Sequence, residues 1–321
     1  MADFKVVVTD IRFPAFKEEE DVLAEIGAEL VLTDCTTPEE VREACADADG
    51  VLANMAPVTA EVIEGMEKCK VIARYGVGVD NVDVAAATRK GIYVTNEPGY
   101  CAEEVSDHAM ALLLSAARGI LIRDRGVRSG KWNIEEAKPS FRIKGKTVGV
   151  VGFGAIAKGF CSKIAGFAPE RICVFDPFVS AGDIESLGAV KVELDDLLAE
   201  SDYISLHAPL NDKTRHMIDS AAFAKMKKKP LLVNTSRGGL IDQAAMIDAL
   251  NQGQIRGAGL DVYETEPLEA ESPLRKMDNV VLTDHCSFYG EEAVSDLKRR
   301  VAENAASVLT NGKPITSVNQ I

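Results

Sequence analysis

The 321-residue sequence predicts an α/β protein made of two successive units, each built on a parallel β-sheet. Short apolar segments alternate with helical patterns almost from one end of the chain to the other. This alternation is typical of a parallel sheet covered by helices on both faces. The chain is also longer than one small core requires, so two domains are expected.

The first unit is predicted to contain an apolar strand at each of residues 4–10, 28–34, 49–54, 70–76 and 92–96. Helical patterns separate these strands. One helix is expected to begin after Thr37, which can cap it, because Pro38 suits the first helical position and Glu40 can complete a capping box.

The second unit is predicted to open with a long helix over about residues 101–127, whose apolar side chains form one broad face. Its strands are expected at residues 147–152, 171–176, 202–210, 230–236, 255–263 and 279–285. A last helix over about residues 291–309 should end at the stop signal formed by Gly312 and Pro314.

Charge and cysteine usage exclude several classes of function. The net charge of −14 opposes nucleic acid and anionic membranes as partners. The seven cysteines are odd in number and contain no CxxC pair, which favours reduced thiols in a cytoplasm and predicts no metal site. No apolar run approaches the roughly 20 residues that span a membrane, and the first residues lack the pattern of a signal peptide.

A glycine-rich turn, GFGAIA, follows the first strand of the second unit and opens a helix. Gly152 permits a tight turn, Gly154 lets the backbone approach a pyrophosphate, and the small Ala157 lets the helix pack near the strand. The helix N-terminus offers free N–H groups and a partial positive charge. Glycines also end strands for purely structural reasons, but here the strand, the helix and a downstream acid occur in the order that nucleotide binding requires.

That acid is Asp176, 24 residues after Gly152 at the end of the next strand. A carboxylate at this point binds the hydroxyls of an adenosine ribose. Pro177 and Phe178 follow, with no Arg or Lys nearby to bind a 2′-phosphate, so NAD is predicted rather than NADP.

Three further strand ends of the second unit carry candidate catalytic residues. Arg237 follows one strand, Asp261 and Glu266 follow the next, and His285 ends the last. In open α/β sheets, ligands bind beyond the carboxyl ends of the strands. Each residue alone also suits an ordinary loop, so the prediction depends on their combination.

In this order and spacing, GFGAIA, Asp176, NTSRGGLID, DVYETEP and DNVVLTDH resemble the D-isomer-specific 2-hydroxyacid dehydrogenases. The resemblance extends over essentially the whole chain, including RYGVGVDNVD in the first unit. Within that family, RYGVGVDNVD, NEPGYCAEEVSDHA and HCSFYGEE are most similar to the branch of C-terminal-binding-protein-like dehydrogenases.

The resemblance implies roles that the chemistry explains. The guanidinium of Arg237 would bind the carboxylate and carbonyl oxygens of a 2-oxo acid. His285 would be the acid/base, because the pKa of histidine lies near neutrality. Glu266 would bind the other imidazole nitrogen and define its tautomer.

The resemblance also implies binding residues. In the first unit, the backbone amides of Gly76, Val77 and Gly78 would bind the substrate carboxylate, with Arg74 as a side-chain contact. The aromatic rings of Phe288 and Tyr289 are expected, on their own chemistry rather than by the resemblance, to line an apolar pocket. The cofactor contacts would be Gly152, Gly154, Ala155, Ile156, Asp176, Ala208, Thr235, Asp261 and His285.

The domain layout follows by the same analogy. A Rossmann-type NAD-binding domain, residues 101–288, would be inserted into a flavodoxin-like substrate domain formed by residues 1–100 and 289–321. The long helix over 101–127 contributes to a dimer in such proteins, so a cytoplasmic homodimer is expected. The chain departs from many relatives in having Asp284 rather than Pro before His285, which adds a carboxylate near the acid/base.

The sequence predicts the class of reaction, and one loop bears on the choice of substrate. Relatives that use phosphorylated acids carry basic residues in the loop after the third strand, whereas residues 54–57 here have none. An unphosphorylated 2-oxo acid, reduced by NADH, is therefore favoured. The alternatives are a phosphoglycerate-dehydrogenase-like activity and an NAD(H)-sensing binding protein with little turnover.

Overall fold

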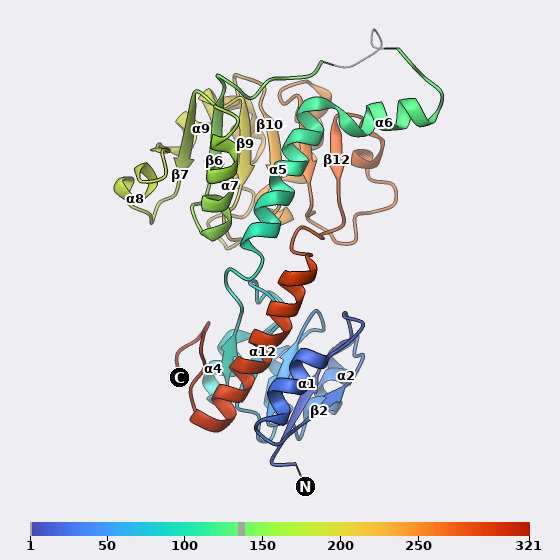
Figure 1. Cartoon of the computed structure of the whole chain (residues 1–321), viewed down its shortest axis with the longest axis vertical. Helices are drawn as coiled ribbons and strands as arrows, with labels where there is room; N and C mark the ends of the chain where they lie inside the picture. The colour runs from blue at the N-terminus through green and yellow to red at the C-terminus, as the bar shows by residue number, and fades with distance from the viewer. Residues whose placement is uncertain (1, 134–138) are drawn as a thin grey trace. The chain divides into compact units, whose positions relative to one another are not determined.

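The computed structural model describes residues 2–133 and 139–321, and the chain divides into two compact units (Figure 1). Unit 1 comprises Met1–Tyr100 and Gly290–Ile321, and unit 2 comprises Cys101–Tyr289. Unit 1 is thus formed by both ends of the chain, and unit 2 by its middle.

Unit 1 contains a five-stranded parallel sheet in the order β2-β1-β3-β4-β5. Its strands are β1 (Phe4–Val8), β2 (Ala28–Leu32), β3 (Gly50–Ala53), β4 (Val71–Arg74) and β5 (Tyr93–Thr95). Its helices are α1 (Lys17–Ala24), α2 (Pro38–Cys45), α3 (Ala60–Gly65), α4 (Val84–Lys90) and α12 (Glu291–Asn311). Central strands are buried on both faces, as their apolar sequences predict.

Local sequence explains where these helices begin. The capping box predicted at Thr37 is present, because its side chain accepts from the Glu40 amide while the Glu40 side chain binds the Thr37 amide. Asp83 caps α4 in the simpler way, by accepting from the amide of Ala86. Helix α12 contributes Leu297 and Val301 to the core that it shares with α1, β3 and β4.

Unit 2 contains a seven-stranded parallel sheet in the order β12-β11-β10-β9-β6-β7-β8. Its strands are β6 (Thr147–Val151), β7 (Arg171–Phe175), β8 (Val190–Lys191), β9 (Tyr203–Leu206), β10 (Leu231–Asn234), β11 (Gly257–Leu260) and β12 (Val280–Leu282). The chain runs from β6 outward to β8 and then returns to β9 on the other side of β6. The switch point where open α/β sheets bind ligands therefore lies between β6 and β9. The short edge strand β8 was not predicted.

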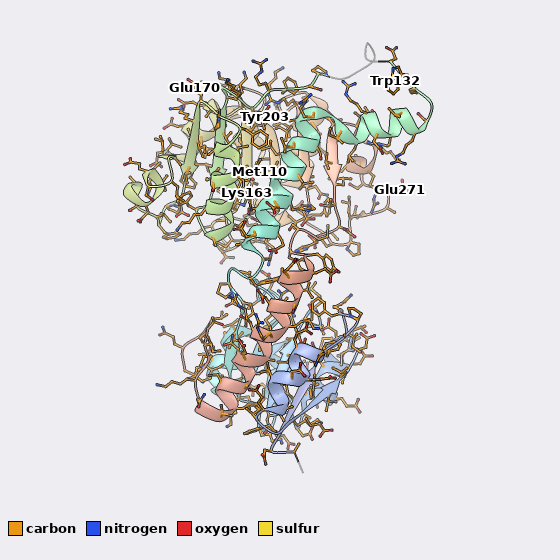
Figure 2. All side chains as sticks on the ribbon, viewed as in Figure 1. Met110, Trp132, Lys163, Glu170, Tyr203 and Glu271 are labelled. Carbon is orange, nitrogen blue, oxygen red and sulfur yellow. The ribbon has the colours of Figure 1, made fainter. Side chains whose placement is uncertain are left out.

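Helices cover both faces of this sheet. They are α5 (Ala102–Arg118), α6 (Ile120–Arg128), α7 (Ala155–Ala165), α8 (Ala181–Glu185), α9 (Leu194–Glu200), α10 (Ser220–Lys225) and α11 (Gln243–Asn251), with the 3₁₀ turns η1 (Gly238–Leu240) and η2 (Pro273–Lys276). Helix α5 packs against α7, β10 and β11. Tyr203, labelled in Figure 2, is fully buried in this unit, and its hydroxyl donates to the carbonyl of Arg142.

The single helix predicted over residues 101–127 is wrong in one respect, because the chain forms two helices that meet at 63°. Gly119 separates them with a φ of +61°, a left-handed conformation that glycine adopts without a steric cost. The periodic apolar pattern continued past this residue and concealed the break. None of the nine residues of α6 is buried.

Among the described residues, no single helix is both long enough and apolar enough to cross a membrane. Only the bent pair α5 and α6 reaches that length and composition together.

Candidate active site

The glycine turn after β6 has the geometry expected of a nucleotide-binding loop. Gly152 has a φ of +89°, and a Cβ there would lie 2.8 Å from the backbone nitrogen of Ala208. Gly154 caps helix α7, is exposed, and has no heavy atom within 4 Å of the place where its Cβ would be. The exposed Ala155 follows at the start of the helix. The turn is thus closed on its strand side and open on the side where a pyrophosphate would bind.

Asp176 lies against this turn at the end of β7. Its Oδ2 accepts from the amide of Phe153 at 2.9 Å, and its Oδ1 accepts from the amides of Phe178 and Val179 at 2.8 and 3.1 Å. These three bonds hold the carboxylate beside the loop. Phe178, which follows closely in the chain, is 91% exposed and offers an apolar surface that the sequence did not assign to the site.

The other predicted cofactor residues lie at the switch point and beyond. Ala208 follows β9 and closes the back of the Gly152 turn, while Ile156 is half-buried in the first turn of α7. Thr235, at the end of β10, has a buried hydroxyl without a hydrogen-bond partner within the described part of the chain. A polar group of a bound ligand would supply the hydrogen bond that this buried hydroxyl lacks. The residues present therefore fit a dinucleotide.

His285 and Glu266 form a close pair. The imidazole Nδ1 lies 2.6 Å from Glu266 Oε2, and the other carboxylate oxygen accepts from the amide of Tyr263 at 3.0 Å. An ionised carboxylate only accepts, so Nδ1 carries the proton and Nε2 is the nitrogen that can take or give one.

Electrostatics keep Glu266 ionised. Its half-buried position acts to raise its pKa, but the hydrogen bonds from His285 and Tyr263 and the charges of His285 and Arg237 together lower that pKa below its ordinary value. The backbone next to Arg237 packs against the same loop, because a Cβ on Gly238 would lie 1.9 Å from the carbonyl carbon of Tyr263. The structure thus brings Arg237, Glu266 and His285 together within unit 2.

The backbone positions Arg237 and His285 in ways that the sequence did not reveal. His285 has a φ of +58°, and its amide donates to the carbonyl of Asp261 at 2.8 Å. Arg237 Nη1 donates to the carbonyl of Ser236 at 2.8 Å. After Arg237 the chain turns so closely under the next loop that a Cβ on Gly238 would overlap the backbone of Tyr263.

Asp261 is the centre of a buried hydrogen-bond network. Its carboxylate accepts from the Thr283 hydroxyl at 2.6 Å and from the amides of Cys286 and Ser287, each at 3.0 Å. Burial acts to raise the pKa of Asp261, but these bonds together lower it. Since Thr283 donates its proton to Asp261, the His108 Nε2 that lies 3.0 Å from the Thr283 oxygen must be the donor in that bond.

This network also contains donor atoms of the kind that zinc uses. Atoms of His108, Asp261 and Cys286 lie within 4.8 Å of one another. The sequence predicted no metal site. Burial and a hydrogen bond to Asp284 raise the pKa of the Cys286 thiol to about 11, so it stays protonated at neutral pH. The Asp284 carboxylate thus acts on the neighbouring thiol.

The predicted carboxylate-binding loop of unit 1 follows β4. The carbonyl of Gly76 accepts from the amide of Glu97 at 2.9 Å, and that of Val77 accepts from the Asn96 side chain at 2.6 Å. Val77 is 41% exposed and Gly78 is half-buried, whereas the Arg74 guanidinium lies across the face of Gly76. The loop is held by these carbonyls and by the amide of Gly76, which donates to the carbonyl of Arg74 at 2.9 Å. The predicted role of the Gly76 amide in carboxylate binding therefore competes with a bond inside the loop. Phe288 is half-buried at the end of unit 2.

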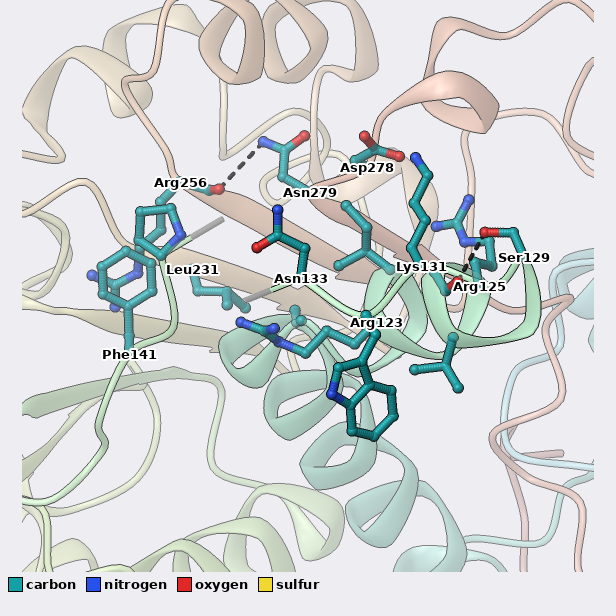
Figure 3. Close-up of a pocket in the computed structure, with 17 residues that line it drawn as sticks. Arg123, Arg125, Ser129, Lys131, Asn133, Phe141, Leu231, Arg256, Asp278 and Asn279 are labelled. Atoms are coloured by element: carbon teal, nitrogen blue, oxygen red, sulfur yellow. Dashed lines mark hydrogen bonds between the residues drawn. The ribbon is translucent and has the colours of Figure 1, made fainter. Parts of the chain in front are cut away.

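A cavity of about 1260 Å³ lies elsewhere in unit 2 (Figure 3). Its wall includes Leu231, which begins β10, and Arg256 and Asn279, which precede β11 and β12. These residues lie at the amino ends of parallel strands, whereas Arg237 and His285 follow the carboxyl ends. The cavity therefore lies at the opposite end of the strands from the candidate catalytic residues. Arg256 stacks on Phe141 there, with 4.3 Å from the guanidinium carbon to the ring centre.

Comparison with known sequences identifies relatives of the whole chain. Residues 110–287 match the family described as "D-isomer specific 2-hydroxyacid dehydrogenase, NAD binding domain". A glyoxylate reductase of Korarchaeum cryptofilum is 41% identical over 278 residues, which are 85% of this chain and 83% of the relative. A D-3-phosphoglycerate dehydrogenase of Archaeoglobus fulgidus is 38% identical over 97% of this chain, and the match spans 58% of that longer relative.

Solved structures of similar fold also cover nearly the whole chain. A glyoxylate reductase from Paecilomyes thermophila has a TM-score of 0.90 at 29% identity, with 99% of each chain covered. The apo D-lactate dehydrogenase from Escherichia coli has a TM-score of 0.84 at 32% identity and covers 98% of this chain and 100% of its own.

Proposed function

Because the chain belongs to the D-isomer-specific 2-hydroxyacid dehydrogenases, a family of NAD-dependent oxidoreductases that act on CH–OH groups, we propose that it reduces a small, unphosphorylated 2-oxo acid with NADH. The observation that carries this proposal is the His285–Glu266 pair with the charge of Arg237 beside it.

The chain's own residues account for the polar half of the reaction. Bound NADH supplies the hydride. Nε2 of His285 gives a proton to the carbonyl oxygen, and the Glu266 carboxylate stabilises the imidazolium before that transfer. Arg237 binds the substrate carboxylate and offsets the negative charge that develops on the carbonyl oxygen. In unit 1, the amides of Val77 and Gly78 and the side chain of Arg74 are proposed as further carboxylate-binding groups.

The charge of unit 1 supports an unphosphorylated substrate. The loop after β3 comprises Asn54, Met55, Ala56 and Pro57, none of which can pair with a phosphate dianion. The relatives named D-3-phosphoglycerate dehydrogenase favour the second candidate, a phosphorylated 3-carbon acid. An NAD(H)-binding protein with little turnover is the third.

The test is NADH oxidation, followed by absorbance, against glyoxylate, pyruvate, hydroxypyruvate, phosphohydroxypyruvate, branched oxo acids and 2-oxoglutarate, with NADPH in parallel. We expect the best kcat/KM with an unphosphorylated acid and NADH. A preference for phosphohydroxypyruvate over hydroxypyruvate would replace the proposal by the second candidate. Tight NADH binding without turnover of any acid would replace it by the third.

We further propose a homodimer that forms through α6. This helix exposes Ile120, Leu121 and Val127, and Trp132 just beyond it is 90% exposed (Figure 2). Large apolar side chains exposed on one short segment favour a protein interface there. A cytoplasmic location is proposed on the seven free cysteines of the structure, and cell fractionation tests it.

A further inference from the structure

We propose that His216 and Glu264 are positioning residues, which hold the loop that carries Glu266 so that its carboxylate meets His285. This inference rests on the proposed function and assigns a role to a pair that lies outside the predicted catalytic group. It concerns unit 2 alone.

The loop in question needs an external support. Residues 264–267 follow β11 and form a bend without helix or strand hydrogen bonds. Glu266 lies in this bend, and among the residues that the structure describes its side chain engages one backbone group, the amide of Tyr263 in the same loop. Something other than regular secondary structure must therefore hold the bend against the rest of the sheet.

Glu264 provides that support with both of its carboxylate oxygens. Oε1 is hydrogen-bonded to Nε2 of His216, which comes from the loop after β9, and Oε2 accepts from the amide of Gln243 at 3.2 Å. Gln243 begins helix α11, where a free amide and the helix dipole both favour a carboxylate. One side chain thus ties the bend to two other elements.

His216 is itself held in place by the turn after Arg237. Its amide donates to the carbonyl of Gly239 at 2.8 Å, and its backbone has the left-handed φ of +52°. The same turn touches the backbone of Tyr263 and Glu264, because Gly238 leaves no room for a Cβ there. The pair therefore joins the loop of Arg237 to the loop of Glu266.

The geometry of the bend transmits this support to the catalytic group. Glu264 and Glu266 are two residues apart, and their carboxylates bind different partners, His216 and His285. If the Glu264 contacts are lost, the bend can shift by the fraction of an ångström that lengthens the 2.6 Å bond between Glu266 and His285. Proton transfer is sensitive to such a shift, whereas binding of the cofactor at the β6 turn is not.

The experiment compares wild type with His216→Gln, Glu264→Gln and the double variant. We measure kcat and KM for the best 2-oxo acid, the Kd for NADH and the Tm. We expect kcat to fall by about tenfold, the equivalent of about 1.4 kcal/mol, while KM and Kd change by less than about twofold. The double variant should be no slower than the slower single variant, because both remove the same contact.

Asp195→Asn is the matched control. It breaks an exposed ion pair of the same unit, between Lys225 of α10 and Asp195 of α9, whose nitrogen and oxygen lie 2.6 Å apart. This variant should keep the wild-type kcat. An unchanged kcat in the two test variants, or a loss that appears equally in kcat, Kd and Tm, would overturn the positioning role.

A second readout does not require turnover and so separates this inference from the proposed function. The imidazole proton that His285 donates to Glu266 should give a far-downfield NMR resonance, assigned by its loss in His285→Ala. It should shift or broaden in His216→Gln and Glu264→Gln but not in Asp195→Asn. If the resonance is unaltered in both variants, the inference is contradicted even when no substrate has been found. If the resonance shifts in the variants but the wild type reduces no 2-oxo acid, only the proposed function is contradicted.

Discussion

Substitution of Gly152 by alanine should lower the stability of the protein, whereas substitution of Gly154 by alanine should weaken NADH binding. At Gly152 the φ of +89° and the 2.8 Å approach of the Ala208 amide both penalise a Cβ. The left-handed backbone costs about 1–2 kcal/mol and overpacking about 1–3 kcal/mol, which together give about 2–5 kcal/mol. At about 2–4 °C per kcal/mol for a domain of this size class, Gly152→Ala should lower the Tm by about 4–20 °C.

Gly154→Ala should instead fold normally and bind NADH poorly. Its Cβ would meet no protein atom within 4 Å, and the change at a helix N-cap costs less than about 1 kcal/mol. That Cβ would occupy the space through which the pyrophosphate approaches the backbone, so the Kd for NADH should rise by about tenfold or more, the equivalent of about 1.4 kcal/mol.

Thermal unfolding and NADH fluorescence titration measure the two effects on the same samples. A Gly152→Ala protein as stable as wild type would refute the packing argument. A Gly154→Ala protein with the wild-type Kd would refute the placement of the pyrophosphate.

Three further predictions concern other parts of the molecule. Burial raises the pKa of Glu97 to about 7 from 4.5, so folding favours its protonated form, and the stability that this provides below pH about 4.5 is lost as the pH rises through 7. Glu97→Gln should then be more stable than wild type at pH 8.5 by up to about 3 kcal/mol and equal to it at pH 4, in urea unfolding; parallel pH profiles would contradict this. The pKa of Glu266 is lowered, so its stabilising charge is present above the unfolded pKa near 4.5 and lost at lower pH. Glu266→Gln should therefore be less stable than wild type at pH 7, by a difference that shrinks as the pH falls below about 4.5. It should also lower kcat by about 10–100-fold; a wild-type kcat would remove Glu266 from the mechanism. Finally, Val127→Glu on the exposed face of α6 should shift the dimer toward monomer in light scattering, whereas an unchanged mass would place the interface elsewhere.

All strands except the short β8 could be predicted from the sequence, because they obey local rules. Apolar runs such as 147–152 and 230–236 are too short for helices and end at glycine or polar residues, and β6 and β10 lie within them. The break between α5 and α6 was missed because the apolar pattern of the helix continued through Gly119, and a single glycine within such a pattern does not by itself define a boundary.

The candidate site was predictable where a residue's position depends on its own strand. Arg237, Asp261 and His285 each follow a strand of one parallel sheet. Their common location at the carboxyl ends of the strands could therefore be inferred from the sequence. The contacts across loops could not. His216 lies 48 residues before Glu264, and no local pattern connects them. The same is true of His108 and Thr283, which are 175 residues apart.

The most direct test of the proposed mechanism is the kcat/KM of wild type, His285→Ala and Arg237→Ala with NADH and the best 2-oxo acid, together with the Kd for NADH and the Tm. We predict that each substitution lowers kcat/KM by about 10²–10⁴-fold, while the NADH affinity changes far less than kcat/KM and each variant remains folded. Turnover near the wild-type level in either variant would contradict the assignment of acid/base and carboxylate-binding roles to this pair.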